Sequence, residues 1–348
     1  MALHVLRPGL LTTVQDLGRP GLQHIGVGPG GAMDQASHRL ANALVGNPGD
    51  AATLEMALVG PELRFGSDAL VALHGAPFSA RLDGVPMPWA RPVLVAAGAR
   101  LQVGNATGGC YGYLAVAGGI DVPVVLQGRG TCLPGGFGGV AGAPLAAGSV
   151  VPLAADVADC SRARFARLTA SRAAVDIGPA SRSVRWFVPS FTLPGDGLPV
   201  IRALPGLHVP LLGDAVRAAF LGATWRVTPE SNRMGLRLAG PALPVRPATE
   251  VVTEATWRGT VQVPPGGQPI ALLADHQATG GYPKIAEVIA ADTALLAQLP
   301  PGAGLRVVTV DLASADAALE EREGQVGRLV RRLAWEFGHE RPPCTAST

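Results

Sequence analysis

The run Gln268-Pro-Ile-Ala-Leu-Leu-Ala-Asp-His-Gln-Ala-Thr-Gly-Gly-Tyr-Pro-Lys284 joins an apolar segment to a dense group of polar side chains. Its first part, from Pro269 to Leu273, is short, aliphatic and bounded by turn-forming residues, which predicts a buried β-strand. Asp275 and His276 follow where this strand ends. Because the pockets of sheet proteins gather polar groups at such ends, the run predicts both a β-sheet and a site.

The last residue of this run, Lys284, is the only lysine in the sequence, although lysine and arginine together number 28. An ammonium is a compact, strongly hydrated charge whose pKa falls on burial, whereas a guanidinium stays planar and charged. A chain that uses arginine everywhere else and retains one lysine indicates a site that needs an amine. The alternative is a chance survivor on a solvated surface.

The side chains near Lys284 have complementary chemistry. Asp275 can orient a donor or take a proton, and Thr279 and Tyr282 can donate to a carbonyl oxygen. Lys284 can neutralise an oxyanion or a phosphate, and the pair Gly280-Gly281 lets the backbone approach a ligand closely. The alternative is a turn in which the carboxylate and the neighbouring imidazole make local hydrogen bonds. The convergence of so many polar types favours a site.

A second polar cluster is Pro229-Glu-Ser-Asn-Arg-Met-Gly235. Asn232 carries both a donor and an acceptor, and Arg233 offers a fork suited to a carboxylate or a phosphate. The alternative is a turn with an exposed arginine. In the functional interpretation, Asn232 and Arg233 are candidates for the same site.

The glycine-rich run Gly26-Val-Gly-Pro-Gly-Gly31 precedes a helical pattern that begins after Asp34. Its spacing and its proline do not fit a Rossmann fingerprint, and Pro283 before the sole lysine excludes a Walker motif. The run is therefore either an anion site made of backbone N–H groups or a plain tight turn.

The whole chain of 348 residues has 16% charged residues and a formal net charge of +2, which gives no reason to expect nucleic acid or an anionic membrane as a partner. Its mean hydropathy of +0.28 is high, yet glycine, proline or a charge interrupts each apolar run. The N-terminus lacks the pattern of a signal peptide, so we expect a cytoplasmic protein. The four cysteines are widely spaced, which argues against a zinc site, and we expect no metal.

With 46 glycines and 31 prolines, the sequence favours short strands joined by turns over long helices. The helical patterns are 34–44, 284–299 and 314–337, and the fold class is mostly β with minor α. We predict an N-terminal mostly-β domain (1–185), a second β-barrel domain (186–312) and a helix with a flexible tail (313–348). The predicted strands are Leu70–Leu73, Pro92–Val95, Tyr113–Val116, Thr260–Val263, Pro269–Leu273 and Leu305–Val310.

Several runs together resemble one known family. They include Gln15-Asp-Leu-Gly-Arg-Pro-Gly21, Gly26 to Asp34, Tyr113 to Val122, Ser231-Asn-Arg-Met-Gly235 and Gln268 to Lys284. In this order they resemble the biotin-dependent carboxyltransferase family, which includes allophanate hydrolase subunit 2 and the C subunit of 5-oxoprolinase. The resemblance implies β-barrel domains related to cyclophilin.

The resemblance also implies partners and an activity. The C subunit of 5-oxoprolinase works with a similar B subunit and with an A subunit, and the complex opens 5-oxo-L-proline to L-glutamate with ATP as co-substrate. The alternatives are transfer of a carboxyl group from biotin to urea or a related amide, and a non-catalytic role as regulatory partner of a kinase inhibitor that resembles the B subunit. Covalent biotin is not expected on this chain, because Pro283 and Ile285 flank Lys284 where a biotin site has methionines.

The resemblance and the residue chemistry together give the predicted site. A pocket for an amide needs an acceptor for its N–H and donors for its oxygen. The predicted catalytic residues are Asp275, Lys284, Tyr282, Asn232 and Arg233. The predicted substrate-binding residues are His276, Gln277, Thr279, Gly280, Gly281, Gln262, Met33 and Asp34.

Overall fold

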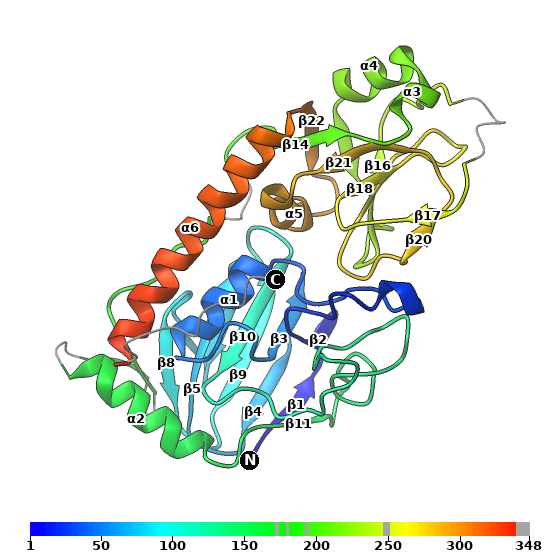
Figure 1. Cartoon of the computed structure of the whole chain (residues 1–348). Helices are drawn as coiled ribbons and strands as arrows, with labels where there is room; N and C mark the ends of the chain where they lie inside the picture. The colour runs from blue at the N-terminus through cyan, green and yellow to red at the C-terminus, as the bar shows by residue number, and fades with distance from the viewer. Residues whose placement is uncertain (171–173, 179–180, 192–194, 246–250, 339–348) are drawn as a thin grey trace. The chain divides into compact units, whose positions relative to one another are not determined.

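The structure is a computed structural model that describes residues 1–170, 174–178, 181–191, 195–245 and 251–338 (Figure 1). It is mostly β with a C-terminal helix, as predicted. The chain divides into two compact units, and each of them is discontinuous in sequence. Sequence reasoning did not anticipate that a short early segment joins the second unit. The first unit is Met1–Gly18, Asp34–Leu193 and Gly324–Thr348, and the second is Arg19–Met33 and Pro194–Glu323.

The first unit is built on two mainly antiparallel sheets whose apolar faces form one core. Strand β1 shows the reason, since Leu3 and Val5 alternate with more exposed neighbours and enter that core. The six-stranded sheet has the order β11 (Val150–Pro152), β1 (Ala2–Arg7), β4 (Glu62–Phe65), β9 (Arg100–Ala106), β6 (Phe78–Leu82) and β7 (Val85–Pro86). The seven-stranded sheet has the order β12 (Val175–Gly178), β13 (Ser181–Ser183), β8 (Pro92–Val95), β5 (Ala69–Gly75), β10 (Tyr111–Val116), β3 (Thr53–Ala57) and β2 (Leu11–Gln15).

Helices α1 (Gln35–Leu44) and α2 (Val157–Thr169) lie against the seven-stranded sheet, where both contact β5 (Figure 1). Strand β5 is therefore buried along its whole length. The prediction of α1 is confirmed, and Asp34 caps it by accepting from the Ser37 backbone N–H at 3.0 Å. The region after residue 154, which has little strand pattern, holds α2 followed by β12 and β13.

The second unit contains a closed barrel of seven strands. Every neighbouring pair is antiparallel except β14 and β22, which run parallel. Beside the barrel lies a two-stranded ribbon, β17 (Glu254–Ala255) and β20 (Thr279–Gly280), and a 3₁₀ turn, η1 (Gln23–Ile25). The barrel order is β14 (Val200–Pro205), β21 (Lys284–Val288), β18 (Thr260–Gln262), β19 (Ile270–Leu272), β16 (Gly235–Ala239), β15 (Trp225–Val227) and β22 (Gly304–Thr309).

Each of the six predicted strand segments overlaps a strand, namely β5, β8, β10, β18, β19 and β22, and the predictions extend beyond the strands only at Val263, Pro269, Leu273 and Val310. The prediction of helix from residue 284 onward is wrong for its first part. Lys284–Val288 forms β21, and the helix α5 is confined to Ala290–Ala297. Pairing of β21 with both β14 and β18 closes the barrel and outweighs the helix preference of Lys284, Ala286 and Glu287.

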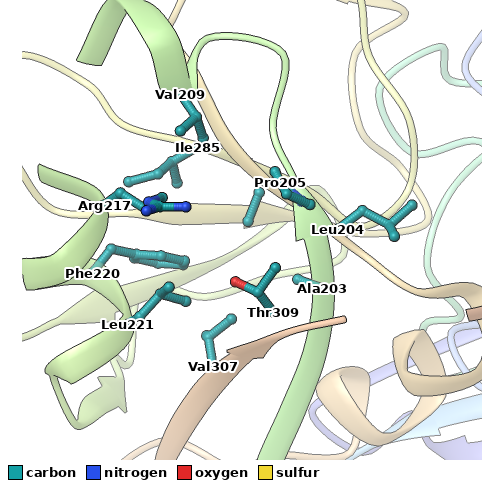
Figure 2. A pocket seen from close by; sticks show the side chains of 11 residues that line it. Ala203, Leu204, Pro205, Val209, Arg217, Phe220, Leu221, Ile285, Val307 and Thr309 are labelled. Atoms are coloured by element: carbon teal, nitrogen blue, oxygen red, sulfur yellow. The ribbon is translucent and has the colours of Figure 1, made fainter. Parts of the chain in front are cut away.

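Two further helices, α3 (Val209–Leu212) and α4 (Asp214–Gly222), cover one part of the barrel. Figure 2 shows Phe220 and Leu221 of α4 near Val307 of β22, with Ile285 of β21 close by. The hollow among these side chains is mostly apolar, and no residue of the predicted site lines it. It serves to seat α4 on the barrel.

The C-terminal helix α6 (Leu312–Glu336) confirms the third predicted helix. Its first turns belong to the second unit, where Ala315 and Ala318 join a small core with Ile289 and Ala291. The predicted flexible tail, 341–348, lies outside the described residues. Over the part of the chain that the structure describes, we find no helix with the length and apolar character needed to cross a membrane.

Candidate functional site

Lys284 is the first residue of β21, and its ammonium is buried against the ribbon. Its Nζ donates to Oε2 of Glu254 at 2.9 Å and to the carbonyl oxygen of Ala255 at 2.7 Å. The Lys284 side chain is 5% exposed and that of Glu254 is 35% exposed. A buried ammonium needs a counter-charge and hydrogen-bond acceptors, and β17 supplies both. An ammonium has three N–H donors. The described residues accept two of them, so one donor remains for a ligand.

His208 completes the surroundings of this ion pair. Its Nδ1 accepts from the backbone N–H of Lys284 at 3.1 Å, so the neutral ring carries its proton on Nε2. That nitrogen lies 3.8 Å from Oε2 of Glu254. The carboxylate therefore faces two donors, and the Lys284 hydrogen bond holds the pKa of Glu254 below its ordinary value.

Arg233 and Asp275 form a second ion pair, which is closed on all sides. The guanidinium donates to the two carboxylate oxygens at 2.8 and 2.9 Å, and the side chains are 2% and 3% exposed. The same guanidinium donates to the Gly31 carbonyl oxygen at 2.8 Å. In addition, the Asp275 backbone N–H donates to the Arg233 carbonyl oxygen at 2.9 Å. With this geometry Arg233 acts as a positioning residue for the loop and for Asp275.

The glycine-rich run predicted as an anion site or a turn lies against Ala274–His276. The Gly30 N–H donates to the Ala274 carbonyl oxygen at 3.0 Å. A Cβ at Gly28 would lie 2.8 Å from the His276 carbonyl oxygen, so only glycine fits there. One of its N–H groups is thus used within the protein, and the run forms a wall of the candidate site.

His276 and Gln262 are buried beside the ribbon, and each is 2% exposed. Nδ1 of His276 lies 2.7 Å from the Gln277 carbonyl oxygen and 3.2 Å from Oγ1 of Thr256. Burial lowers the pKa of His276, which keeps the ring neutral near pH 7. Within the described residues, the Nε2 atoms of His276 and Gln262 have no hydrogen-bond partner.

Residues 25–309 match the family described as carboxyltransferase domain, subdomain A and B. The chain belongs to the carboxyltransferase-domain family. This family result agrees with the resemblance seen in the sequence runs.

Three relatives of this carboxyltransferase domain are informative. The chain is 37% identical to the C subunit of 5-oxoprolinase from Escherichia coli, over 97% of this chain and 99% of the relative. It is 35% identical to the C subunit of 5-oxoprolinase from Haemophilus influenzae, over 91% of this chain and 95% of the relative. The crystal structure of urea amidolyase from Kluyveromyces lactis matches 94% of this chain with a TM-score of 0.81 at 30% identity, but only 20% of that larger chain is covered.

The structure places the other predicted residues of the carboxyltransferase domain outside this buried group. The Asn232 side chain accepts from the Met234 backbone N–H at 2.8 Å, which forms a local turn. Tyr282 is 46% exposed. Met33 is fully buried, and its carbonyl oxygen accepts from the Arg258 guanidinium. Asp34 lies in the first unit, where it caps α1. Three further predicted residues are at least partly exposed, namely Gln277, Thr279 and Gly281.

Four residues of the site were not predicted from the sequence: Glu254, His208, Thr256 and Arg258. The run Thr253-Glu-Ala-Thr-Trp-Arg258 contains three of them and matches no motif. One signal was available for Glu254, since a single functional lysine, if buried, requires a carboxylate somewhere in the chain. The described residues contain no group of three or more His, Cys, Asp and Glu side chains suited to a metal ion.

Proposed function

We propose that this chain is the C subunit of an ATP-dependent 5-oxoprolinase and cleaves 5-oxo-L-proline to L-glutamate together with the A and B subunits. The observation that carries the proposal is the similarity to two relatives that bear the name of this C subunit, of which the match covers 99% and 95%. Three free thiols, Cys110, Cys132 and Cys160, fit a reducing compartment, so we place the complex in the cytoplasm.

The chemistry of the site supports an amide substrate. Resonance makes a lactam carbonyl a poor electrophile, so the complex must stabilise negative charge on its oxygen. Lys284 retains one N–H donor for that oxygen after the ribbon has taken the other two. Asp275 and Arg233 are bound to each other, and in this proposal they hold the walls of the pocket in place.

ATP enters the proposal as a co-substrate of the complex. A triphosphate requires several cationic or N–H groups that face one cavity. In this site Lys284 is paired with Glu254, and Arg233 is paired with Asp275. The site therefore does not fit a triphosphate, and we assign the nucleotide to the other subunits.

The test is phosphate release by the chain co-expressed with its candidate A and B subunits, supplied with ATP and 5-oxoproline. Release that depends on 5-oxoproline and disappears when this chain is omitted is the expected result. An intact complex that releases no phosphate would overturn the proposal.

The second candidate is carboxyl transfer from biotin to urea or a related amide. The likeness to the Kluyveromyces lactis urea amidolyase favours it. In that case the biotin sits on another chain, because the sole lysine, Lys284, is 4% exposed and bound to Glu254. A streptavidin blot of co-purified material that detects a biotinylated carrier, together with urea-dependent turnover, would favour this candidate.

A further inference from the structure

Two unsatisfied polar atoms lie next to the ribbon in the second unit. Nε2 of His276 and Nε2 of Gln262 are buried, and neither has a hydrogen-bond partner among the described residues. A buried polar group without a partner loses its hydration without compensation, and native proteins contain few such groups. A pair of such atoms in one small region therefore needs an explanation.

The hydrogen-bond chemistry of each atom follows from its surroundings. Nδ1 of His276 lies 2.7 Å from the Gln277 carbonyl oxygen, which can only accept, so Nδ1 carries the proton. Nε2 of His276 therefore presents a lone pair and accepts. Nε2 of Gln262 is an amide nitrogen with N–H donors. The two side chains thus offer one acceptor atom, Nε2 of His276, and one donor atom, Nε2 of Gln262.

Thr256 links the two side chains, since its hydroxyl lies beside His276 and its methyl group lies with Gln262 at Gly280. The Thr256 hydroxyl lies 3.2 Å from Nδ1 of His276. A Cβ built on Gly280 would lie 2.4 Å from Nε2 of Gln262 and 3.1 Å from the Thr256 methyl group. The absence of a side chain at residue 280 is what lets the Gln262 amide occupy this position.

A ligand that satisfies both atoms must present a donor and an acceptor on one edge. A trans peptide places its N–H and its C=O on opposite edges. A lactam ring forces the amide to be cis, and a primary amide or urea also carries an N–H on the same side as its oxygen. We propose that His276 accepts from the N–H, and Gln262 donates to the C=O, of such a cis amide.

The ribbon covers this pair in the structure. Strands β17 and β20 pair through Glu254–Gly280 and Ala255–Thr279, and the Thr256 backbone N–H donates to the Ala278 carbonyl oxygen at 3.1 Å. Lys284 holds β17 by two hydrogen bonds. Since both Nε2 atoms are buried and Gly280 lies against Gln262, the proposal requires the ribbon to move away from Gln262 when the amide binds. This inference rests on the proposed function, because it names the residues that would recognise the lactam.

Binding of small probes to the full chain tests the inference. The probes are 2-pyrrolidone, which has the cis amide, and γ-butyrolactone, in which a ring oxygen replaces the N–H and faces the His276 lone pair. We expect 2-pyrrolidone to shift the signals of the protein in a saturable NMR titration. We expect γ-butyrolactone to bind at least tenfold more weakly, which is about 1.4 kcal/mol. Equal affinity for the two probes, or no saturable binding of 2-pyrrolidone, would overturn the proposal.

Variants separate recognition from folding. His276→Asn keeps a donor for the Gln277 carbonyl oxygen and removes the Nε2 acceptor, and Gln262→Met removes the donor at similar volume. Both should bind 2-pyrrolidone at least tenfold more weakly and lose the discrimination between the probes. Gln268→Met is the matched control, since this glutamine binds Gly240 through its amide elsewhere on the barrel and should retain full affinity. If Gln268→Met weakened binding as much, the assignment would be wrong.

The experiment distinguishes failure of the assigned residues from failure of the proposed oxoprolinase function. Preference for 2-pyrrolidone without turnover of 5-oxoproline in the complex would support the cis-amide site and reject the proposed oxoprolinase. Turnover of 5-oxoproline that is unchanged in both His276→Asn and Gln262→Met would support the oxoprolinase and reject the assigned residues.

Discussion

The two ion pairs of the second unit differ in how completely the protein encloses them. In the Arg233–Asp275 pair both side chains are 2–3% exposed, and the carboxylate receives two guanidinium hydrogen bonds. In the Lys284–Glu254 pair the ammonium is 5% exposed, the carboxylate is 35% exposed, and one hydrogen bond joins them. Water can replace the partner of Glu254 but not that of Asp275.

This difference indicates different tasks. A fully enclosed, bidentate pair fixes one geometry, and breaking it leaves a charge with no solvation. A half-open pair can exchange partners, because the carboxylate is hydrated when the ammonium turns to a ligand. We therefore expect changes at Asp275 to act mainly on folding and changes at Lys284 to act mainly on function.

The largest expected effect is that of Asp275→Asn. The variant removes the carboxylate to which the buried Arg233 guanidinium donates two hydrogen bonds, which should lower the free energy of unfolding by about 3–5 kcal/mol. Urea denaturation followed by circular dichroism measures it. Asp214→Asn is the control, since that carboxylate is 94% exposed in its pair with Arg217 and its loss should change stability by about 0.5 kcal/mol or less.

A double variant tests the cause. Arg233→Met combined with Asp275→Asn removes both charges, so it should be more stable than Asp275→Asn alone. If the double variant were less stable than the single one, the buried Arg233 charge that has lost the Asp275 carboxylate would not be the source of the loss.

Gly280→Ala should have the next largest effect on stability. The added methyl group would lie 2.4 Å from Nε2 of Gln262, so either the amide or the ribbon must shift. We expect a loss of about 1 kcal/mol in the free energy of unfolding, at the low end for overpacking because the nearest atom is the end of a flexible side chain, together with weaker binding of 2-pyrrolidone. Gly266→Ala has open space around its added carbon and serves as the control. Identical stability of the two variants would contradict the close packing of Gly280.

Lys284→Met should cost less stability than either change. It retains the apolar stem and removes hydrogen bonds only to Glu254, whose side chain is 35% exposed, and to the carbonyl oxygen of the exposed Ala255, so water can replace both. In the proposed complex, phosphate release should fall at least tenfold, about 1.4 kcal/mol in activation free energy. Lys284→Arg should lose turnover as well, because a guanidinium differs in shape from an ammonium. Wild-type turnover in Lys284→Arg would remove the argument for a functional lysine.

Local patterns in the sequence were sufficient to predict much of the fold. The short aliphatic runs became strands, and Asp34 caps the predicted helix. The part from Lys284 to Val288 could not be predicted in this way. Its lysine, alanine and glutamate suit a helix and its isoleucine and valine suit a strand, so pairing with β14 and β18, which are distant in sequence, decides the outcome.

The candidate site was predicted in part for the same physical reason. Asp275, His276 and Lys284 lie in one run, so their proximity is a local property. Their partners come from elsewhere, since Glu254 is 30 positions and His208 is 76 positions from Lys284. Such contacts depend on barrel closure, which no single segment encodes. Asn232 shows the opposite case, where a polar residue in a promising cluster serves a local turn.

The smallest expected effect is the pH dependence of the half-open pair. The hydrogen bond from Lys284 holds the pKa of Glu254 in the folded protein below its ordinary value. A lowered folded-state pKa means that the stabilisation is fully present above the unfolded-state value, about 4.3, and is lost as the pH falls through the folded-state value.

Lys284→Met lacks this contribution at every pH. The difference in Tm between wild type and Lys284→Met should therefore be constant from about pH 7 to about pH 5 and should shrink at lower pH. Glu254→Gln should reproduce this behaviour, since it removes the titrating group itself. A difference that persists unchanged at about pH 3, where the carboxyl group approaches its neutral form, would show that Lys284 stabilises the fold through its packing and not through this pair.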